Sequence, residues 1–522
     1  MLTVENGGVL QLEKRIYEVG KGDTEDRFYA LSNNDACVKK IALHIQGKED
    51  VTVEGNGAVL LCRDFITAIG IADSRRVTVR NLTIDYLGNR HLEVLIGKTN
   101  GNVAEVFPRE GFPFSLDGAL TANGERIEKT LIMQFDGKAL RPCYRLNYRF
   151  ADFGQTAEKG FYQSAKLYRE DGRYYIRIDE AGWLTEGNVL MIAYADRSQQ
   201  AVFVHNSADV CFENVTVCYS PSMAFMCQLT DNLTLRNITV ATNGKHGVLS
   251  SLGDATHFTH CGGKVTIANG RFFHMMDDAV NVHGNYTVVE AVDGKRITAK
   301  IMHRQQEGVN VLPVGDTVTV YQGKTIDEKA FFRVAKSELI EAGRIALEAD
   351  EETSVAVGDT LYNGERMPEV EITATACGNN RPRGFLLTTP KRAVVRGCRF
   401  SNCEHGIELA GDTSYWFESG GCKEVLIEDC VFDNCNYTDG QYPIVVRPTF
   451  DKNGKEKFYH KNITVQGNRF VGFTGGMVWA RNAQNLVIKD NTYVFDGTFP
   501  KEEAKEGMFS LIDCEAVLEN KG

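Results

Sequence analysis

The side chains best suited to chemistry lie in the stretch RFFHMMDDAVNVHGN, residues 271–285. It contains two adjacent carboxylates, Asp277 and Asp278, and then alternates polar or small residues with Val280 and Val282. A period of two is typical of a strand with one buried face. Six of the eleven histidines also fall between residues 246 and 303. We therefore expect the polar face of this strand to look onto solvent or onto a ligand.

Adjacent aspartates have a structural explanation as well as a functional one. In an extended run, Asp277 and Asp278 point to opposite faces, so both meet a ligand only if one lies at a corner. Asp is common at corners for structural reasons alone, because its side chain accepts backbone N–H bonds. The polar row formed by Asp277, Asn281 and His283 favours a functional site.

A third carboxylate strengthens the functional interpretation. Asp254 lies 23 residues before Asp277 in the irregular stretch SSLGDATHFTHCGG. One turn of a repeat of that length would place the two side by side. Carboxylates crowded together repel one another, and such a cluster can keep one member protonated as a general acid. With His257 and His283 nearby, a metal site is the rival use, but the chain has no dense DxDxDG loop and we expect no metal.

Two later stretches offer groups that could bind a sugar. CGNNRPRGFLLTT contains Arg381 and Arg383, and arginine donates paired hydrogen bonds to carboxylates or to neighbouring hydroxyls. HGIELAGDTSYWFESGG contains Trp416 and Glu418, and an aromatic face suits the C–H face of a sugar ring. The structural alternatives are solvated surface arginines and a tryptophan that anchors its own loop.

The scaffold that must position these residues is repetitive. An eight-residue pattern has apolar residues at its first, third and eighth positions and Asn, Asp or Gly at its fifth, and a looser copy starts at Val51. Its clear copies begin at Val77, Val210, Leu233, Val265, Ala393, Val425, Ile463 and Leu486. Most spacings are 23 to 38 residues, which is enough for a coil of about three short strands. Since Asn, Asp and Gly tolerate the left-handed conformation of a sharp corner, the repeat predicts an all-β, right-handed parallel β-helix.

Two long gaps between copies, 77 to 210 and 265 to 393, contain additional strand-like runs. They predict two small antiparallel β-domains inserted into the β-helix. We expect an N-terminal cap and first coils in 1–87, a first insert in 88–196, coils with the catalytic groove in 197–284, a second insert in 285–376, and final coils and a cap in 377–522. The second insert and the loops of 379–418 should wall the groove.

The composition argues against some classes of binding partner. The net charge of −11, without a Lys/Arg run, argues against a nucleic-acid or anionic-membrane surface. The first residues lack the features of a signal peptide, so we expect a cytoplasmic protein, or a periplasmic or secreted one if a signal has been removed.

The fourteen cysteines form no CxxC pair, and we interpret them as reduced residues of the core. Two inserts projecting from a rod are compatible with a homodimer.

Four segments in this order resemble glycoside hydrolase family 110: DATHF from Asp254, MDDAVNVHG from Met276, NNRPRGFLLTT from Asn379 and GDTSYWFESG from Gly411. The resemblance covers nearly the whole chain. It implies an exo-acting α-1,3-galactosidase that removes the terminal galactose of the blood-group B determinant or of linear Gal-α-1,3-Gal, inverts the anomeric configuration and needs no metal or organic cofactor.

The resemblance also implies site residues. The motifs carry catalytic roles onto Asp254, Asp277 and Asp278. The segment MHRQQEGV from Met302 resembles a family segment that brings Gln306 and Glu307 towards the sugar, although Glu307 stands where an aromatic residue is expected. An inverting pair needs carboxyl groups about 6.5–9.5 Å apart. Because neighbouring Asp277 and Asp278 would share the water side, Asp254 is our expected acid.

Two alternatives remain open on the sequence. One is another β-helix carbohydrase, such as a polygalacturonase-like hydrolase or a polysaccharide lyase. The other is a non-catalytic glycan-binding β-helix, in which the carboxylates only accept hydrogen bonds from sugar hydroxyls. For the galactosidase that the resemblance implies, the expected partner is an oligosaccharide or glycoconjugate substrate.

Overall fold

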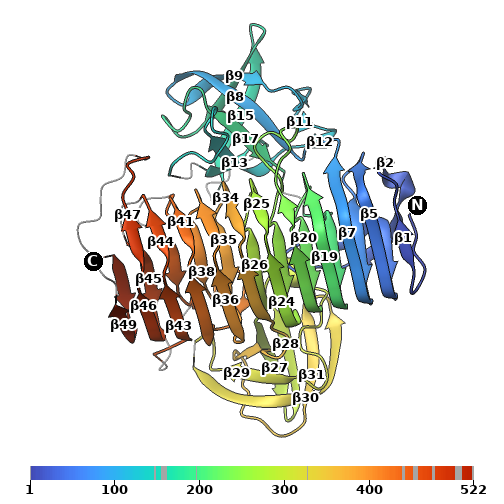
Figure 1. The fold of residues 1–522 in the computed structure, drawn as a ribbon, viewed down its shortest axis with the longest axis vertical. Coiled ribbons are helices and arrows are strands. Elements are labelled where there is room, and N and C mark those ends of the chain that lie inside the picture. The colour runs from blue at the N-terminus through green and yellow to red at the C-terminus, as the bar shows by residue number, and fades with distance from the viewer. Residues whose placement is uncertain are drawn as a thin grey trace.

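The computed structural model describes residues 2–145, 148–154, 162–194, 197–325, 327–437, 441–450, 457–472, 476–499 and 508–519. The chain forms a parallel β-helix from which two closed barrels project (Figure 1). One continuous apolar core runs inside the coils, from Leu12 near the start to Ile488 near the end. The predicted fold class, a parallel β-helix with two small inserted β-domains, is confirmed.

A typical coil has three short strands. In one coil these are β20 (Phe225–Gln228), β21 (Asp231–Arg236) and β22 (Thr239–Val240). The next coil repeats them as β23 (Thr256–Thr259), β24 (Gly262–Ala268) and β25 (Arg271–Phe273), each paired in parallel with its predecessor. Stacking therefore builds two long sheets along the molecule.

The 13-stranded sheet carries the functional strands. Besides β20 and β23 it contains β3 (Glu25–Tyr29), β4 (Cys37–Gln46), β6 (Thr67–Ala72), β18 (Val202–His205), β26 (Val280–Asn285), β35 (Arg383–Leu387), β38 (His405–Leu409), β42 (Ile444–Val446), β45 (Val478–Arg481) and β48 (Phe509–Ile512). The short β39 (Glu418–Ser419) pairs with β26 in antiparallel fashion.

The 20-stranded sheet covers the other sides of the coils. Besides the strands already given it contains β1 (Val9–Gln11), β2 (Ile16–Val19), β5 (Glu49–Cys62), β7 (Arg75–Tyr86), β19 (Ala208–Val217), β33 (Glu369–Thr373), β34 (Ala376–Gly378), β36 (Arg392–Arg396), β37 (Arg399–Ser401), β40 (Glu424–Glu428), β41 (Val431–Asp433), β43 (His460–Gln466), β44 (Arg469–Val471), β46 (Ala483–Lys489), β47 (Thr492–Val494) and β49 (Ala516–Glu519).

The fifth residue of each clear repeat copy forms the corner that the pattern predicts. All eight have a φ between 53° and 65°; they are Asn81, Asn214, Asn237, Asn269, Gly397, Asp429, Gly467 and Asp490. Three of the asparagines also form a ladder: Asn214 donates to Asn81 at 3.0 Å and Asn237 donates to Asn214 at 2.8 Å. The corner residue thus supplies both the backbone conformation and a bond to the next coil.

One coil escaped the sequence pattern. Strand β33 pairs with β24 on one side and β36 on the other, so the segment VEITATAC from Val370 is a further repeat copy. Its corner residue is Ala374, with a φ of 48°. Alanine rarely adopts this conformation, which is why a pattern that requires Asn, Asp or Gly at the corner does not find it.

The first barrel lies between β7 and β18. Its strands are β8 (His91–Asn100), β9 (Val103–Pro108), β13 (Lys129–Phe135), β14 (Tyr148–Asp152), β15 (Gln163–Glu170), β16 (Arg173–Ile178) and β17 (Val189–Ala193). A small sheet of β10 (Phe114–Ser115), β11 (Thr121–Ala122) and β12 (Glu125–Arg126) accompanies it. The strands pair in antiparallel fashion except for β14 and β15, which are parallel.

The second barrel lies between β26 and β33 and is antiparallel. It contains β27 (Thr287–Asp293), β28 (Arg296–Ile301), β29 (Thr317–Tyr321), β30 (Glu328–Glu341), β31 (Arg344–Ala349) and β32 (Thr360–Tyr362). The two short 3₁₀ helices described are η1 (Lys21–Asp23), before β3, and η2 (Arg304–Gln306), after β28. Each barrel has its own apolar core.

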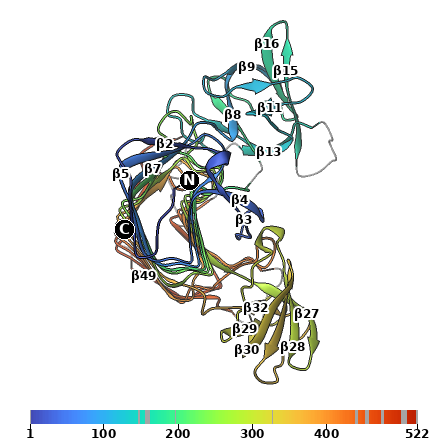
Figure 2. The ribbon, with the colours of Figure 1, turned by 90° about the vertical axis from the view of Figure 1, so that its right-hand side faces the viewer.

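The two barrels lie above and below the β-helix in Figure 1, and both lean towards the side on which β3 and β4 lie (Figure 2). The outer face of the 13-stranded sheet is therefore flanked by a barrel on each side. In the part of the chain that the structure describes, no helix is long and apolar enough to cross a bilayer.

Candidate active site

A pocket of about 610 Å³ lies over the 13-stranded sheet, where β23, β26 and β35 begin. Asp254, Asp277 and Asp278 all line it. Val280 and Val282 of β26 pack into the apolar core of the coils, which turns the alternate residues Asn281 and His283 to the outer face. The alternation predicted for this strand is thus present.

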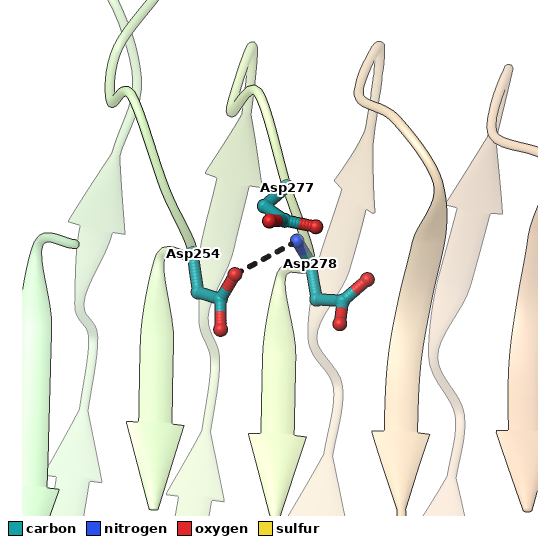
Figure 3. Close-up of side chains that lie close together, drawn as sticks. All are labelled: Asp254, Asp277 and Asp278. Atoms are coloured by element: carbon teal, nitrogen blue, oxygen red, sulfur yellow. Dashed lines mark hydrogen bonds between the residues drawn. The ribbon is translucent and has the colours of Figure 1, made fainter. Parts of the chain in front are cut away.

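The coil register decides how the carboxylates meet. Thr256 pairs with Val280 and His257 with Asn281, an offset of 24 residues. Asp254 therefore lies beside Asp278, and the backbone N–H of Asp278 donates to Asp254 Oδ1 at 3.2 Å (Figure 3). We had placed Asp254 beside Asp277 on a coil of 23 residues; the coil is one residue longer, and Asp277 lies in the turn before the strand.

The three carboxyl groups are close together. One oxygen of each carboxyl group lies within 4.8 Å of one oxygen of each of the other two. Their accessibility differs: the Asp277 side chain is 18% exposed, against 3% for Asp254 and 1% for Asp278. Asp277 is thus the carboxyl group that solvent reaches most easily.

Two arginines hold two of the carboxylates. Arg383 donates from Nε and from a terminal nitrogen to the two oxygens of Asp278, both at 2.9 Å. Its remaining terminal nitrogen lies 3.5 Å from the buried Glu408. Arg197 reaches only one oxygen of Asp277, at 3.0 Å. The fork on Asp278 fixes that carboxylate in one orientation, whereas the other oxygen of Asp277 is not held by Arg197.

Burial and charge act differently on the two enclosed carboxyl groups. Burial raises the pKa of Asp254 well above its usual range, and the charge of Asp277 raises it further. Burial also raises the pKa of Asp278 well above its usual range, and the charge of the Arg383 guanidinium, with its two hydrogen bonds, partly offsets this shift because both favour the charged form. Asp254 makes hydrogen bonds to His257 and to a backbone N–H rather than to an arginine. A proton in this cluster therefore belongs on Asp254.

Histidines lie behind Asp254. His257 Nδ1 is 2.6 Å from Asp254 Oδ2, and His257 Nε2 is 2.9 Å from His283 Nε2. Burial lowers the pKa of His257 to about 4 and also lowers the pKa of His283. Glu418 lies 3.6 Å from His283 and accepts a 2.8 Å hydrogen bond from Asn33. Both rings are therefore neutral near neutral pH.

Several of the predicted binding residues line the pocket: His257, Asn281, Arg381, Arg383, Trp416 and Glu418. Asn281 Oδ1 is buried, and among the described residues it has no hydrogen-bond partner, so it can accept from a ligand hydroxyl. Arg381 packs over the Tyr148 ring at 4.8 Å. Trp416 packs against His303, with 4.2 Å between the ring centroids.

Three predicted residues lie away from the pocket surface. His283 is behind His257. Gln306 is fully buried and donates to Asn33 Oδ1 at 3.2 Å and to the Trp416 carbonyl at 2.6 Å, so it braces the loop that carries Trp416. Glu307 follows η2 and lies against Gly343, between β30 and β31. The neighbour of these two, Gln305, lines the pocket instead.

Other lining residues were not predicted. They include Asn33, Arg197, Gln305 and Tyr415, together with Lys129, Phe150 and Tyr162 of the first barrel. We had assigned the wall to the second insert and the loops of 379–418. These loops line the pocket, but the first barrel supplies more of the lining than the second insert does. Asn33, Arg197 and the residues of the first barrel belong to no sequence motif, and only the folding of distant parts of the chain brings them to the site. Gln305 and Tyr415 could have been found, because they precede the predicted residues Gln306 and Trp416 in segments that the sequence analysis quotes.

No family model matches the chain. The chain is similar to alpha-1,3-galactosidase A of Bacteroides fragilis, with 27% identity over 531 residues that cover 98% of this chain and 86% of the relative. It is also similar to alpha-1,3-galactosidase B of Parabacteroides distasonis, with 27% identity over 521 residues that cover 94% of this chain and 83% of the relative.

Among solved structures, the A-module of the mannuronan C-5 epimerase AlgE4 of Azotobacter vinelandii aligns with a TM-score of 0.37 and 8% identity, over 96% of this chain and 91% of that one. A polygalacturonase from Erwinia carotovora aligns with a TM-score of 0.33 and 11% identity, over 90% of each chain. By sequence, then, this chain is similar over nearly its whole length to proteins named alpha-1,3-galactosidase.

Proposed function

We propose that this protein is a glycoside hydrolase, an exo-acting α-1,3-galactosidase that releases terminal galactose from blood-group B-type or linear Gal-α-1,3-Gal glycans. The observation that carries the proposal is the cluster of Asp254, Asp277 and Asp278 in a pocket of this relative of the named galactosidases. Carboxyl groups are the usual acids and bases of glycoside hydrolysis. A pocket of this size accepts the end of a glycan.

We assign the general acid to Asp277. In an exo-acting enzyme the terminal sugar enters first and the leaving group points to the mouth, so the acid should be the most accessible carboxyl group. That group is Asp277. Asp254, which we expected in this role, has Oδ2 against His257 and Oδ1 against a backbone N–H.

We assign the general base to Asp278, because two hydrogen bonds from Arg383 orient this carboxyl group and favour its charged form. A water can bridge two carboxyl oxygens up to 4.8 Å apart, because each O–H···O bond spans about 2.8 Å. Such a water between Asp254 and Asp278 would be the nucleophile, which gives inversion. In the step, Asp278 takes a proton from the water, the water oxygen bonds to the anomeric carbon, and Asp277 protonates the departing glycosidic oxygen.

The test is a panel of digalactosides with α-1,3, α-1,4 and α-1,6 linkages, with Asp277→Asn beside the wild type. We expect release from the α-1,3 compound, and a loss of about 100-fold or more in Asp277→Asn because general acid catalysis contributes about that much. The variant should still bind galactose. A chelator should change nothing, because side chains supply both acid and base; inhibition by it would favour a lyase.

Two results would count against the proposal. Release of galactose only from the α-1,4 or the α-1,6 compound would show that the substrate has a different linkage from the one proposed. Binding without turnover in the wild type, weakened in step by Asp277→Asn, would indicate a glycan-binding protein.

A further inference from the structure

Behind the pocket, three side chains form hydrogen bonds in series. Asp254 Oδ2 meets His257 Nδ1 at 2.6 Å, His257 Nε2 meets His283 Nε2 at 2.9 Å, and His283 Nδ1 meets the carbonyl oxygen of Gly284 at 2.8 Å. The three side chains are almost completely buried. We call this series the Asp254 relay.

The carbonyl at its end fixes the direction of every bond. A carbonyl oxygen only accepts, so His283 Nδ1 must carry a proton. A neutral His283 then has a bare Nε2, and His257 Nε2 must donate to it. A neutral His257 in turn has a bare Nδ1, so Asp254 Oδ2 must donate.

Counting protons gives the same result without assigning a state to each ring. Three bonds in series need three protons, and two neutral imidazoles supply two. The third proton has to come from elsewhere, and an ionised Asp254 could not supply it. If it were missing, two lone pairs would face each other at one of the three contacts, at 2.6 Å, 2.8 Å or 2.9 Å, which buried groups do not tolerate.

Burial decides where the third proton resides. It could be on Asp254, or it could make one of the two imidazoles cationic. Both rings are fully buried, and burial lowers the pKa of His257 to about 4. The surrounding charged and titratable groups are Asp277, Asp278, Arg197, Arg383 and Glu418. On the His257 ring Glu418 and Asp277 favour a cation and Arg197 disfavours it, and burial outweighs them. On the His283 ring burial likewise outweighs the charge of Glu418. The neutral carboxylic acid is the form that this environment favours.

We propose that His257 and His283 are positioning residues that keep Asp254 protonated in the resting protein. The relay removes one negative charge from the carboxylate cluster and leaves Asp278 as the charged group on the water side. Asp254 then orients the water and Asp278 takes its proton. This role in turnover rests on the proposed function, but the proton count does not.

The experiment is NMR of the ring nitrogens in histidine-labelled protein without substrate, so that a failure of the galactosidase proposal cannot affect it. We expect His257 with a protonated Nε2 and a bare Nδ1, His283 with the reverse, and no change between about pH 5 and about pH 8. A doubly protonated His257, or a His257 ring that titrates near its ordinary pKa of about 6.5, would overturn the proposal.

Asp254→Asn is the matched variant, because an amide N–H can donate to His257 Nδ1 as the carboxylic acid does. It should keep both tautomers and fold normally. His257→Gln and His283→Gln assign the signals; if either fails to fold, the shift that Asp254→Asn causes in one ring identifies His257. Loss of the His257 pattern in Asp254→Asn would contradict a proton on Asp254.

Thermal stability gives a second readout. A folded-state pKa raised above the unfolded value of about 3.9 contributes stability that is present below that value and is lost as pH rises. The wild type should therefore lose stability relative to Asp254→Asn as pH rises from about 4 towards neutral. A constant difference between the two proteins would contradict the inference.

Discussion

At the scale of single residues, Arg383 is central to the site because its guanidinium contacts both Asp278 and the buried Glu408. Its planar fork fixes both oxygens of the proposed base. We predict that Arg383→Lys lowers kcat by roughly 100-fold, since an ammonium cannot make the two parallel bonds that orient the carboxylate. The control is Arg392→Lys, on the exposed pair with Glu424, which should change kcat little. Equal effects of the two substitutions would deny Arg383 an orienting role.

Substitution of single residues also tests which aspartate is the general acid. A nitrophenyl leaving group needs little protonation, so loss of the acid should harm its hydrolysis far less than that of a disaccharide. We predict this selective rescue for Asp277→Asn and its absence for Asp254→Asn, with kcat/KM on both substrates as the measurement. Rescue of Asp254→Asn alone would restore the acid role to Asp254.

At the scale of elements, the corner residues explain both the success and the gaps of the sequence analysis. Eight corners occupied by Asn, Asp or Gly made the coils visible, whereas the coil with Ala374 was missed. The three aspartates that we propose as catalytic were visible because each lies in a motif just before a strand. Arg197 and the lining residues of the first barrel were not, because only coil stacking and barrel closure bring them to the pocket. The offset of 24 residues likewise follows from pairing rather than from repeat spacing.

The missed corner gives a stability prediction. Ala374 has a left-handed backbone that costs a non-glycine residue about 1–2 kcal/mol, and Asn tolerates it better. We expect Ala374→Asn to raise the free energy of unfolding by about 0.5–1 kcal/mol, measured by chemical denaturation. Ala376→Asn, two residues later in the strand β34, should lower it, because Asn is disfavoured in strands. If both substitutions lowered the free energy of unfolding, the left-handed backbone of Ala374 would not be what limits stability at this corner.

At the scale of the whole molecule, buried neutral histidines should make the protein sensitive to acid. Burial lowers the pKa of His257 and His274 to about 4 and that of His260 and His460 to about 3. Because their unfolded pKa is about 6.5, the unfolded chain binds more protons below that pH, and stability is lost as pH falls. We predict a Tm that drops between about pH 7 and about pH 5, and a smaller drop in His460→Gln. A Tm that rises over this range would contradict neutral burial of these rings.

The whole molecule also accounts for the site: β-helix coils place the carboxylates, and the first barrel closes the pocket beside them. The most direct test of this account is proton NMR of the protein incubated with Gal-α-1,3-Gal and with the B trisaccharide, reading the anomer of galactose at early times. We predict that β-galactose appears first, because a water held by Asp278 displaces the glycan with inversion. Initial α-galactose would contradict the account, because a retaining enzyme needs a carboxylate nucleophile rather than a water in that place.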